Sequence, residues 1–149
     1  MECNGKWVCD SCGKTIDCKE DGWLEWLTSK SENGYHPHHP RIVHRVKCLY
    51  NEDEVYEIYN AIVSDMDLES FLGPDGLMEL LLLISEAKNK DIEDFIRIVK
   101  RLHIPNYEES FRYFNSAISE GAFQPNTKPD YYSQHDMKST IEYIKNIKN

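Results

Sequence analysis

The stretch Lys6-Trp7-Val8-Cys9-Asp10-Ser11-Cys12-Gly13-Lys14-Thr15-Ile16 decides how the N-terminal part of this sequence folds. Two cysteines three positions apart on a tight turn can direct both sulfurs to one tetrahedral ion. Gly13 follows the second cysteine, and glycine permits the positive φ that such a turn needs. Strand-like segments flank the turn, whereas a redox Cys-x-x-Cys pair usually opens a helix. The stretch therefore predicts a zinc knuckle in which Cys9 and Cys12 are ligands.

A closed structural zinc site needs two more ligands, and we predict that His44 and Cys48 supply them. The result is a Cys3His set that holds one structural Zn²⁺ per chain. Residues four apart in a continuous strand lie about 13 Å from each other. The prediction therefore requires that the strand end near His44 and turn into a helix, where residues four apart come within about 6 Å. Cys18 is the alternative fourth ligand.

The histidine-rich segment Tyr35-His36-Pro37-His38-His39-Pro40 is a second candidate for metal binding. Its prolines separate the imidazole rings, and we expect an exposed loop from Ser29 to Pro40. Such a loop, together with the basic strand that follows it, is suited to contact a partner. The candidate partner contacts are His36, His38, His39, Arg41 and Arg45.

The other features of the N-terminus predict a cytoplasmic chain. The five cysteines form an odd set confined to positions 3 to 48, which argues against a disulfide framework. The sequence shows no basic segment followed by an apolar one at its start, and no apolar run of about 18 residues. We therefore expect no membrane span, a reducing compartment, and a free thiol at Cys3.

From Asn51 onward the apolar residues recur with helical spacing, as Val55, Ile58 and Ile62 illustrate. The segment from Leu77 to about Lys88 is apolar nearly all round, which predicts a buried central helix. Further helices are expected to begin at Asp91, at Asn106 and near Asp136.

These patterns together predict an α+β protein. Residues 1–50 would form a β-rich zinc-knuckle head of the treble-clef or ribbon type. Residues 51–149 would form a bundle of about five helices, and the two parts would make one compact unit.

The charge distribution indicates which class of macromolecule the protein binds. Residues 1–50 carry seven basic and seven acidic side chains, whereas residues 51–149 carry ten and nineteen, so the net charge of −9 lies in the second part. Such a surface repels phosphate backbones. We therefore expect a non-catalytic, zinc-stabilised interaction or regulatory protein whose partner is a protein. Binding of nucleic acid through basic residues of the head is the second hypothesis. Those residues are Lys6, Lys14, Lys19, Arg41, Arg45 and Lys47.

The order of a cysteine knuckle, a strand containing Val43-His44-Arg45, and a helix near Asn51 resembles HNH-type metal-dependent nucleases over about a third of the chain. The resemblance implies hydrolysis at a metal ion that has an open coordination position. The sequence departs from the pattern because no later histidine stands near enough to complete such a site. No nucleophile–base pair stands out, so no catalytic residue is predicted and the nuclease stays the alternative.

Overall fold

The computed structural model describes residue 3, residue 5 and residues 7–148. Their elements are mixed α+β, which confirms the predicted class at that level. The chain divides into two compact units, Met1–His103 and Ile104–Asn149, each described below by itself. This division differs from the predicted boundary at residue 50, because the helices between residues 51 and 103 pack on the strands that precede them.

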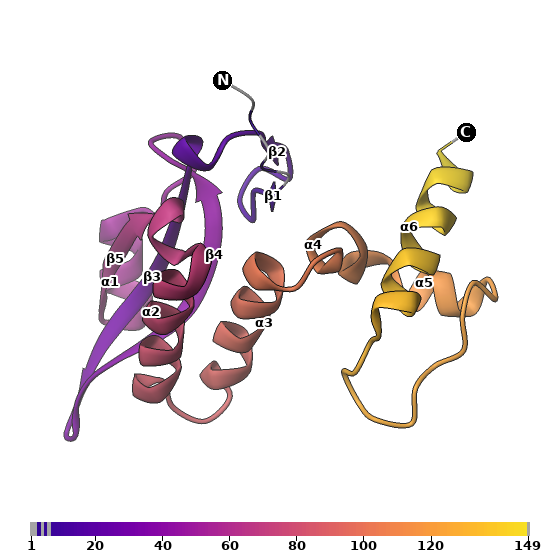
Figure 1. Ribbon diagram of the computed structural model, residues 1–149. Coiled ribbons are helices and arrows are strands. Elements are labelled where there is room, and N and C mark those ends of the chain that lie inside the picture. The colour runs from indigo at the N-terminus through magenta and orange to yellow at the C-terminus, as the bar shows by residue number, and fades with distance from the viewer. Residues whose placement is uncertain (1–2, 4, 6, 149) are drawn as a thin grey trace. The chain divides into compact units, whose positions relative to one another are not determined.

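The first unit contains two antiparallel sheets. The small sheet pairs β1 (Trp7–Val8) with β2 (Thr15–Ile16). The larger sheet has the strand order β4-β3-β5, formed by β3 (Gly22–Ser31), β4 (Gly34–His44) and β5 (Ala61–Asp67). Figure 1 shows β3 and β4 as one long hairpin with helices α2 and α3 alongside it. The β-rich head predicted for the N-terminus is therefore larger than expected and includes residues beyond position 50.

The predicted loop from Ser29 to Pro40 is wrong, because most of this segment belongs to the β3–β4 hairpin. The two strands are joined by a turn at Glu32 and Asn33, and Gly34, the first residue of β4, has a φ of 104°. Pro37 and Pro40 are compatible with β4 because β4 is an edge strand, where a missing outward N–H breaks no ladder hydrogen bond.

The helix predicted to run through Ile62 ends earlier than expected. Helix α1 (Glu52–Tyr59) begins at Asn51, whose side chain accepts a hydrogen bond from the Glu54 N–H at 3.0 Å. It ends at Asn60, which takes the left-handed conformation with a φ of 50°. Strand β5 follows directly, and Ile62 pairs with Thr28 of β3. The helical spacing was misleading because it continued across this stop.

The larger sheet carries apolar side chains on both faces, since successive residues of a strand point to opposite sides. On one face Leu24 belongs to a core shared with α2 (Gly73–Glu86), α3 (Asp91–His103) and the 3-10 helix η2 (Leu68–Phe71). The ring of Trp26, two residues along β3, packs edge-on against Phe71 with ring centres 6.0 Å apart. On the other face Leu27 packs with Val55 of α1 and Ala61 of β5.

The composition of helix α2 predicted that it is buried nearly all round, and this prediction is wrong. Leu80 is fully buried against the sheet and α3, but Leu81 and Leu82 are 48% and 55% exposed and Met78 is 67% exposed. These three side chains form one stripe at positions i, i+3 and i+4, because the sheet and α3 cover only the opposite side of the helix.

The second unit is a small helical assembly. It contains α4 (Tyr107–Ser110), the 3-10 helix η3 (Phe111–Tyr113), α5 (Phe114–Ser119) and α6 (Gln134–Ile147). The single helix expected from Asn106 is thus divided into three short pieces. The rings of Phe114 and Tyr132 stack with their centres 3.8 Å apart and anchor the loop that precedes α6.

Candidate metal centre

The turn between β1 and β2 has the geometry of a knuckle. The Cys9 N–H donates to the Lys14 carbonyl at 2.9 Å, and the Gly13 N–H donates to the Cys9 carbonyl at 2.9 Å. Gly13 has a φ of 76°, the left-handed value for which the sequence suggested a glycine. The Lys14 N–H points at the Cys12 sulfur from 3.5 Å, so the backbone supplies a donor that stabilises a thiolate.

The second half of the centre forms where β4 ends. His44 is the last residue of the strand, and the chain then turns through Val46, which has a φ of 75°. The Cys48 sulfur consequently lies 3.8 Å from His44 Nδ1 instead of the about 13 Å that a continuing strand would impose. The strand therefore ends near His44, as the prediction of His44 and Cys48 as joint ligands required.

The structure brings the four predicted ligands together. One ligand atom from each of Cys9, Cys12, His44 and Cys48 lies within 4.8 Å of all the others, which is close enough to hold a metal ion. The Cys12 sulfur and His44 Nδ1 are 3.4 Å apart. This is the one such group of three or more histidines, cysteines and carboxylates found in the part of the chain that the structure describes.

The orientation of the His44 ring suits a ligand. Its Nε2 lies 3.2 Å from the Thr15 carbonyl oxygen, which can only accept, so Nε2 carries the proton and donates it. The unprotonated Nδ1 is then directed toward the sulfurs of Cys12 and Cys48. A carbonyl that fixes the tautomer in this way is the usual outer partner of a metal-binding histidine.

Cys9 and Cys48 have opposite pKa shifts. Burial raises the pKa of Cys9, but hydrogen bonds outweigh burial and lower the pKa to about 6. The donors of these hydrogen bonds are chiefly the backbone N–H groups of Cys12, His44 and Ser11. Burial, followed by the sulfurs of Cys9 and Cys12, raises the pKa of Cys48. The sulfurs therefore repel a second negative charge, and a bound cation would relieve that repulsion.

The knuckle is held to the rest of the unit by Asp10, a residue that the sequence did not single out. The Asp10 N–H donates to the Ile42 carbonyl at 2.7 Å, and the Ile42 N–H donates to Asp10 Oδ2 at 2.7 Å. The buried Arg101 of α3 donates to the same Oδ2 at 2.7 Å and to the Val8 carbonyl at 3.0 Å. No local motif links positions 10 and 101, so spacing alone gave no indication of this contact.

The other two cysteines form a disulfide. Cys3 is bonded to Cys18, so the predicted free thiol at Cys3 is wrong, and Cys18 lies outside the cluster in which it was the alternative ligand. The Gly5 N–H donates to the Asp17 carbonyl at 3.0 Å and draws the two segments together. The odd cysteine count misled because the three cysteines of the cluster and the two of the disulfide were treated as one chemical group.

The histidine-rich segment lies on β4 and is not a free loop. His38 is 7% exposed, and its Nε2 lies 2.7 Å from the Ser29 hydroxyl. His38 Nδ1 lies 2.7 Å from His39 Nδ1. Burial, the neighbouring His39 and His36 lower the pKa of His38 while Asp91 opposes them, so the imidazole is favoured in its neutral form.

Three of the six basic residues proposed to contact nucleic acid have partners inside the first unit. Arg41 donates to the buried Glu25 at 2.5 Å and to the Cys48 carbonyl at 2.8 Å. Arg45 donates to the Glu20 carbonyl at 3.3 Å, and Lys19 pairs with Glu69 at 2.9 Å. Lys6 lies outside the described residues. Arg41 therefore supports the turn that carries Cys48, which is a structural task.

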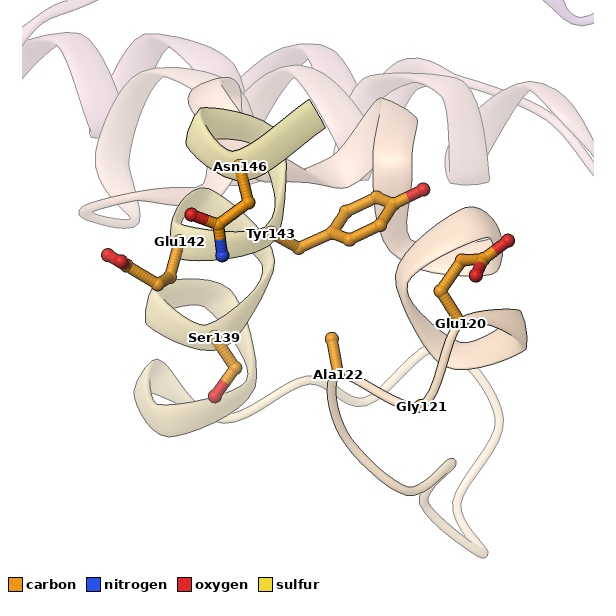
Figure 2. A pocket seen from close by; sticks show the side chains of 7 residues that line it. All are labelled: Glu120, Gly121, Ala122, Ser139, Glu142, Tyr143 and Asn146. Atoms are coloured by element: carbon orange, nitrogen blue, oxygen red, sulfur yellow. The ribbon is translucent and has the colours of Figure 1, made fainter. Parts of the chain in front are cut away.

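The second unit contains a surface pocket that the sequence did not suggest. Its volume is about 360 Å³, and its lining includes Glu120, Glu142 and Tyr143. Figure 2 shows the Tyr143 ring reaching from its helix toward Glu120, while the Glu142 carboxylate is turned away from the ring. The lining offers two separated carboxylates and no convergent set of ligand atoms.

Comparisons with protein-family models, with curated proteins and with solved structures gave no match. No helix among the described residues is both long and apolar enough to cross a membrane.

Proposed function

We propose that Cys9, Cys12, His44 and Cys48 hold one structural Zn²⁺ and that the protein is a non-catalytic, zinc-stabilised module that binds another protein. The convergence of four protein donors within 4.8 Å carries this proposal. Three thiolates and one imidazole are a set that favours zinc over harder ions such as magnesium and calcium. Bonds of about 2.3 Å to sulfur and 2.0 Å to nitrogen in a tetrahedron place ligand atoms about 3.5 to 3.8 Å apart. The observed separations of 3.4 and 3.8 Å fit this geometry.

The donor count supports a structural role for the ion. Four protein ligands complete a tetrahedron and leave no position for a water or a substrate. The ion would join the β1–β2 turn to the end of β4. The free energy of metal binding would therefore contribute to the folding of the first unit. A nuclease of the type that the sequence resembled needs an open position, which a closed Cys3His set does not provide.

A protein partner is supported by the exposed stripe on α2. Met78, Leu81 and Leu82 present large apolar side chains to solvent, which is the composition of interface cores. The acidic Glu79 and Glu86 lie beside them on exposed positions of the same helix. The favoured partner is therefore a protein whose apolar contact surface has a basic rim, since complementary charges surround a typical apolar centre.

The experiment is quantitative affinity capture from nuclease-treated native lysate. We expect the wild-type chain to enrich proteins that the Leu81→Lys/Leu82→Lys variant loses, because lysine places charges in the apolar stripe. Glu79→Lys/Glu86→Lys is a matched control for added positive charge. Its effect should be smaller if apolar contact dominates. Equal enrichment by wild type and the leucine variant would contradict the proposal.

Titration with a random DNA duplex tests the second hypothesis, which is that the protein binds nucleic acid. Fluorescence anisotropy at about 0.15 M salt should show no sub-micromolar binding, because exposed charges are well screened there and the chain has a net charge of −9. Tight binding that weakens steeply as salt is raised would instead favour a nucleic-acid partner.

A further inference from the structure

His38 and His39 are adjacent in sequence, yet their rings lie on the same side of the sheet. In a regular strand, neighbouring residues point to opposite faces. The register between β3 and β4 shifts here: Glu25 pairs with Arg41 and Leu27 pairs with His38. Two residues of β4 thus stand opposite one residue of β3, which is a β-bulge, and bulges commonly redirect a side chain.

The backbone at His39 completes this redirection. Its φ is 51°, in the left-handed region that residues other than glycine seldom adopt. The two Nδ1 atoms consequently face each other at 2.7 Å, and the ring centres are 4.9 Å apart. Two nitrogens at this distance hold a shared proton or flank a cation.

We propose that His38 and His39 form a second metal site that binds a divalent transition ion of the Ni²⁺ and Cu²⁺ class through both Nδ1 atoms. Imidazole nitrogens suit these ions. Metal–nitrogen bonds of about 2.0 Å at a right angle need the two nitrogens about 2.8 Å apart, close to the separation observed. The separation of the two nitrogens therefore matches that of adjacent ligands of a square-planar or octahedral ion.

Binding of the ion to both Nδ1 atoms releases no net proton. In the hydrogen-bonded pair of neutral rings, one ring carries its proton on Nδ1 and donates it to the other. When an ion takes both Nδ1 lone pairs, that ring must carry its proton on Nε2 instead, so a tautomer changes and no net proton is released. For His38, the Nε2–H then donates to the Ser29 hydroxyl, 2.7 Å away. Ser29 thus serves as the outer partner that fixes the ligand tautomer.

The surroundings of the pair leave room for further ligands. His39 is exposed, so water can complete the coordination of the ion. His36 lies on the same strand with its ring centre 5.8 Å from that of His38. His36 Nδ1 is buried and makes no hydrogen bond, the one such side-chain atom found among the described residues. A coordinated water would supply a partner for this nitrogen.

This site is separate from the cysteine centre, so the two can be tested independently. The probe is Ni²⁺, which does not oxidise thiols as Cu²⁺ does, added to the full-length chain without a polyhistidine tag. Its zinc content is measured first. Calorimetry should detect one Ni²⁺ per chain, and visible absorption should show bands of nitrogen-bound Ni²⁺.

His38→Gln and His39→Asn should each weaken this binding by about tenfold or more while the zinc content stays unchanged, since a lost ligand costs at least as much as a lost outer partner. Asparagine tolerates the left-handed backbone at position 39. His135→Gln, at an exposed histidine of the second unit, should leave binding within about twofold, as expected for a non-ligand. Absence of Ni²⁺ binding to the wild type, or wild-type affinity in both variants, would overturn the proposal.

Discussion

Arg101 Nη1 lies 2.7 Å from Asp10 Oδ2 and joins α3 to the turn between Cys9 and Cys12. Only 4% of the Arg101 side chain is exposed, so the ion pair with Asp10 lies in a largely buried environment on the Arg101 side. The same carboxylate oxygen accepts from the Ile42 N–H. One side chain thus connects the turn that carries Cys9 and Cys12, the sheet and a helix that is 91 residues away in sequence.

We expect Asp10→Ala to destabilise the first unit by about 3–5 kcal/mol, because it breaks the ion pair with the buried Arg101 and removes the acceptor of the Ile42 N–H. Asp10→Asn should cost less, since an amide oxygen can still accept hydrogen bonds. Urea denaturation monitored by tryptophan fluorescence measures both changes. Asp17→Ala, at an exposed position nearby, is the control and should stay within about 0.5 kcal/mol of wild type. An Asp10→Ala cost as small as that of the control would refute the structural role of the pair.

The two classes of cysteine should respond differently to substitution. Cys9→Ser or Cys12→Ser should lose the metal and strongly destabilise the first unit, because structural zinc binding contributes on the order of 10 kcal/mol in small zinc domains. Cys3→Ser removes the disulfide to Cys18 and should keep the metal. Its cost should be at most about 3 kcal/mol, the entropy of closing a loop of this size, and should vanish when the wild type is reduced. Melting curves with and without reductant test this, and metal loss in Cys3→Ser would contradict it.

The metal-free chain should become less stable as the pH falls from about 9 to about 6. The pKa of Cys9 is lowered from 9.0 to about 6 in the folded state, so folding favours its thiolate. A group with a depressed folded pKa stabilises fully above its unfolded pKa and loses that contribution as the pH falls through the folded value. Denaturation of chelator-treated protein at several pH values measures the slope. Cys9→Ser should flatten it, and an unchanged slope would show that another group is responsible.

Leucines on the two sides of α2 should differ in their contributions. Leu80→Ala should cost about 2–5 kcal/mol because the side chain is fully buried, whereas Leu81→Ala and Leu82→Ala should each cost less than about 1 kcal/mol. The three variants have the same chemistry and nearly the same helix position, so each is a control for the others. Similar costs at all three positions in urea denaturation would mean that the stripe is covered in the native protein.

Local sequence patterns predicted the part of the site that is local in space. The spacing of Cys9, Cys12 and Gly13 was sufficient to place both cysteines in the cluster, because one turn sets their geometry. His44 and Cys48 followed from a strand-to-helix junction that the sequence marks at Asn51.

Long-range packing set the features that the sequence analysis missed. The exposure of Leu81 depends on which side of α2 the sheet covers, and the role of Arg101 depends on a distant turn. The bulge at His39 requires the register of a neighbouring strand. Composition and spacing along one segment contain none of this information.

X-ray absorption spectroscopy of the tag-free protein at the zinc edge, combined with elemental analysis, tests the central claim most directly. We predict one zinc per chain, bound by three sulfurs at about 2.3 Å and one nitrogen at about 2.0 Å. Cys48→Ser should replace or remove one sulfur scatterer and leave the nitrogen in place. A chain purified under reducing conditions without zinc, or a zinc ion surrounded mainly by oxygen, would contradict the assignment of Cys9, Cys12, His44 and Cys48 as a structural zinc centre.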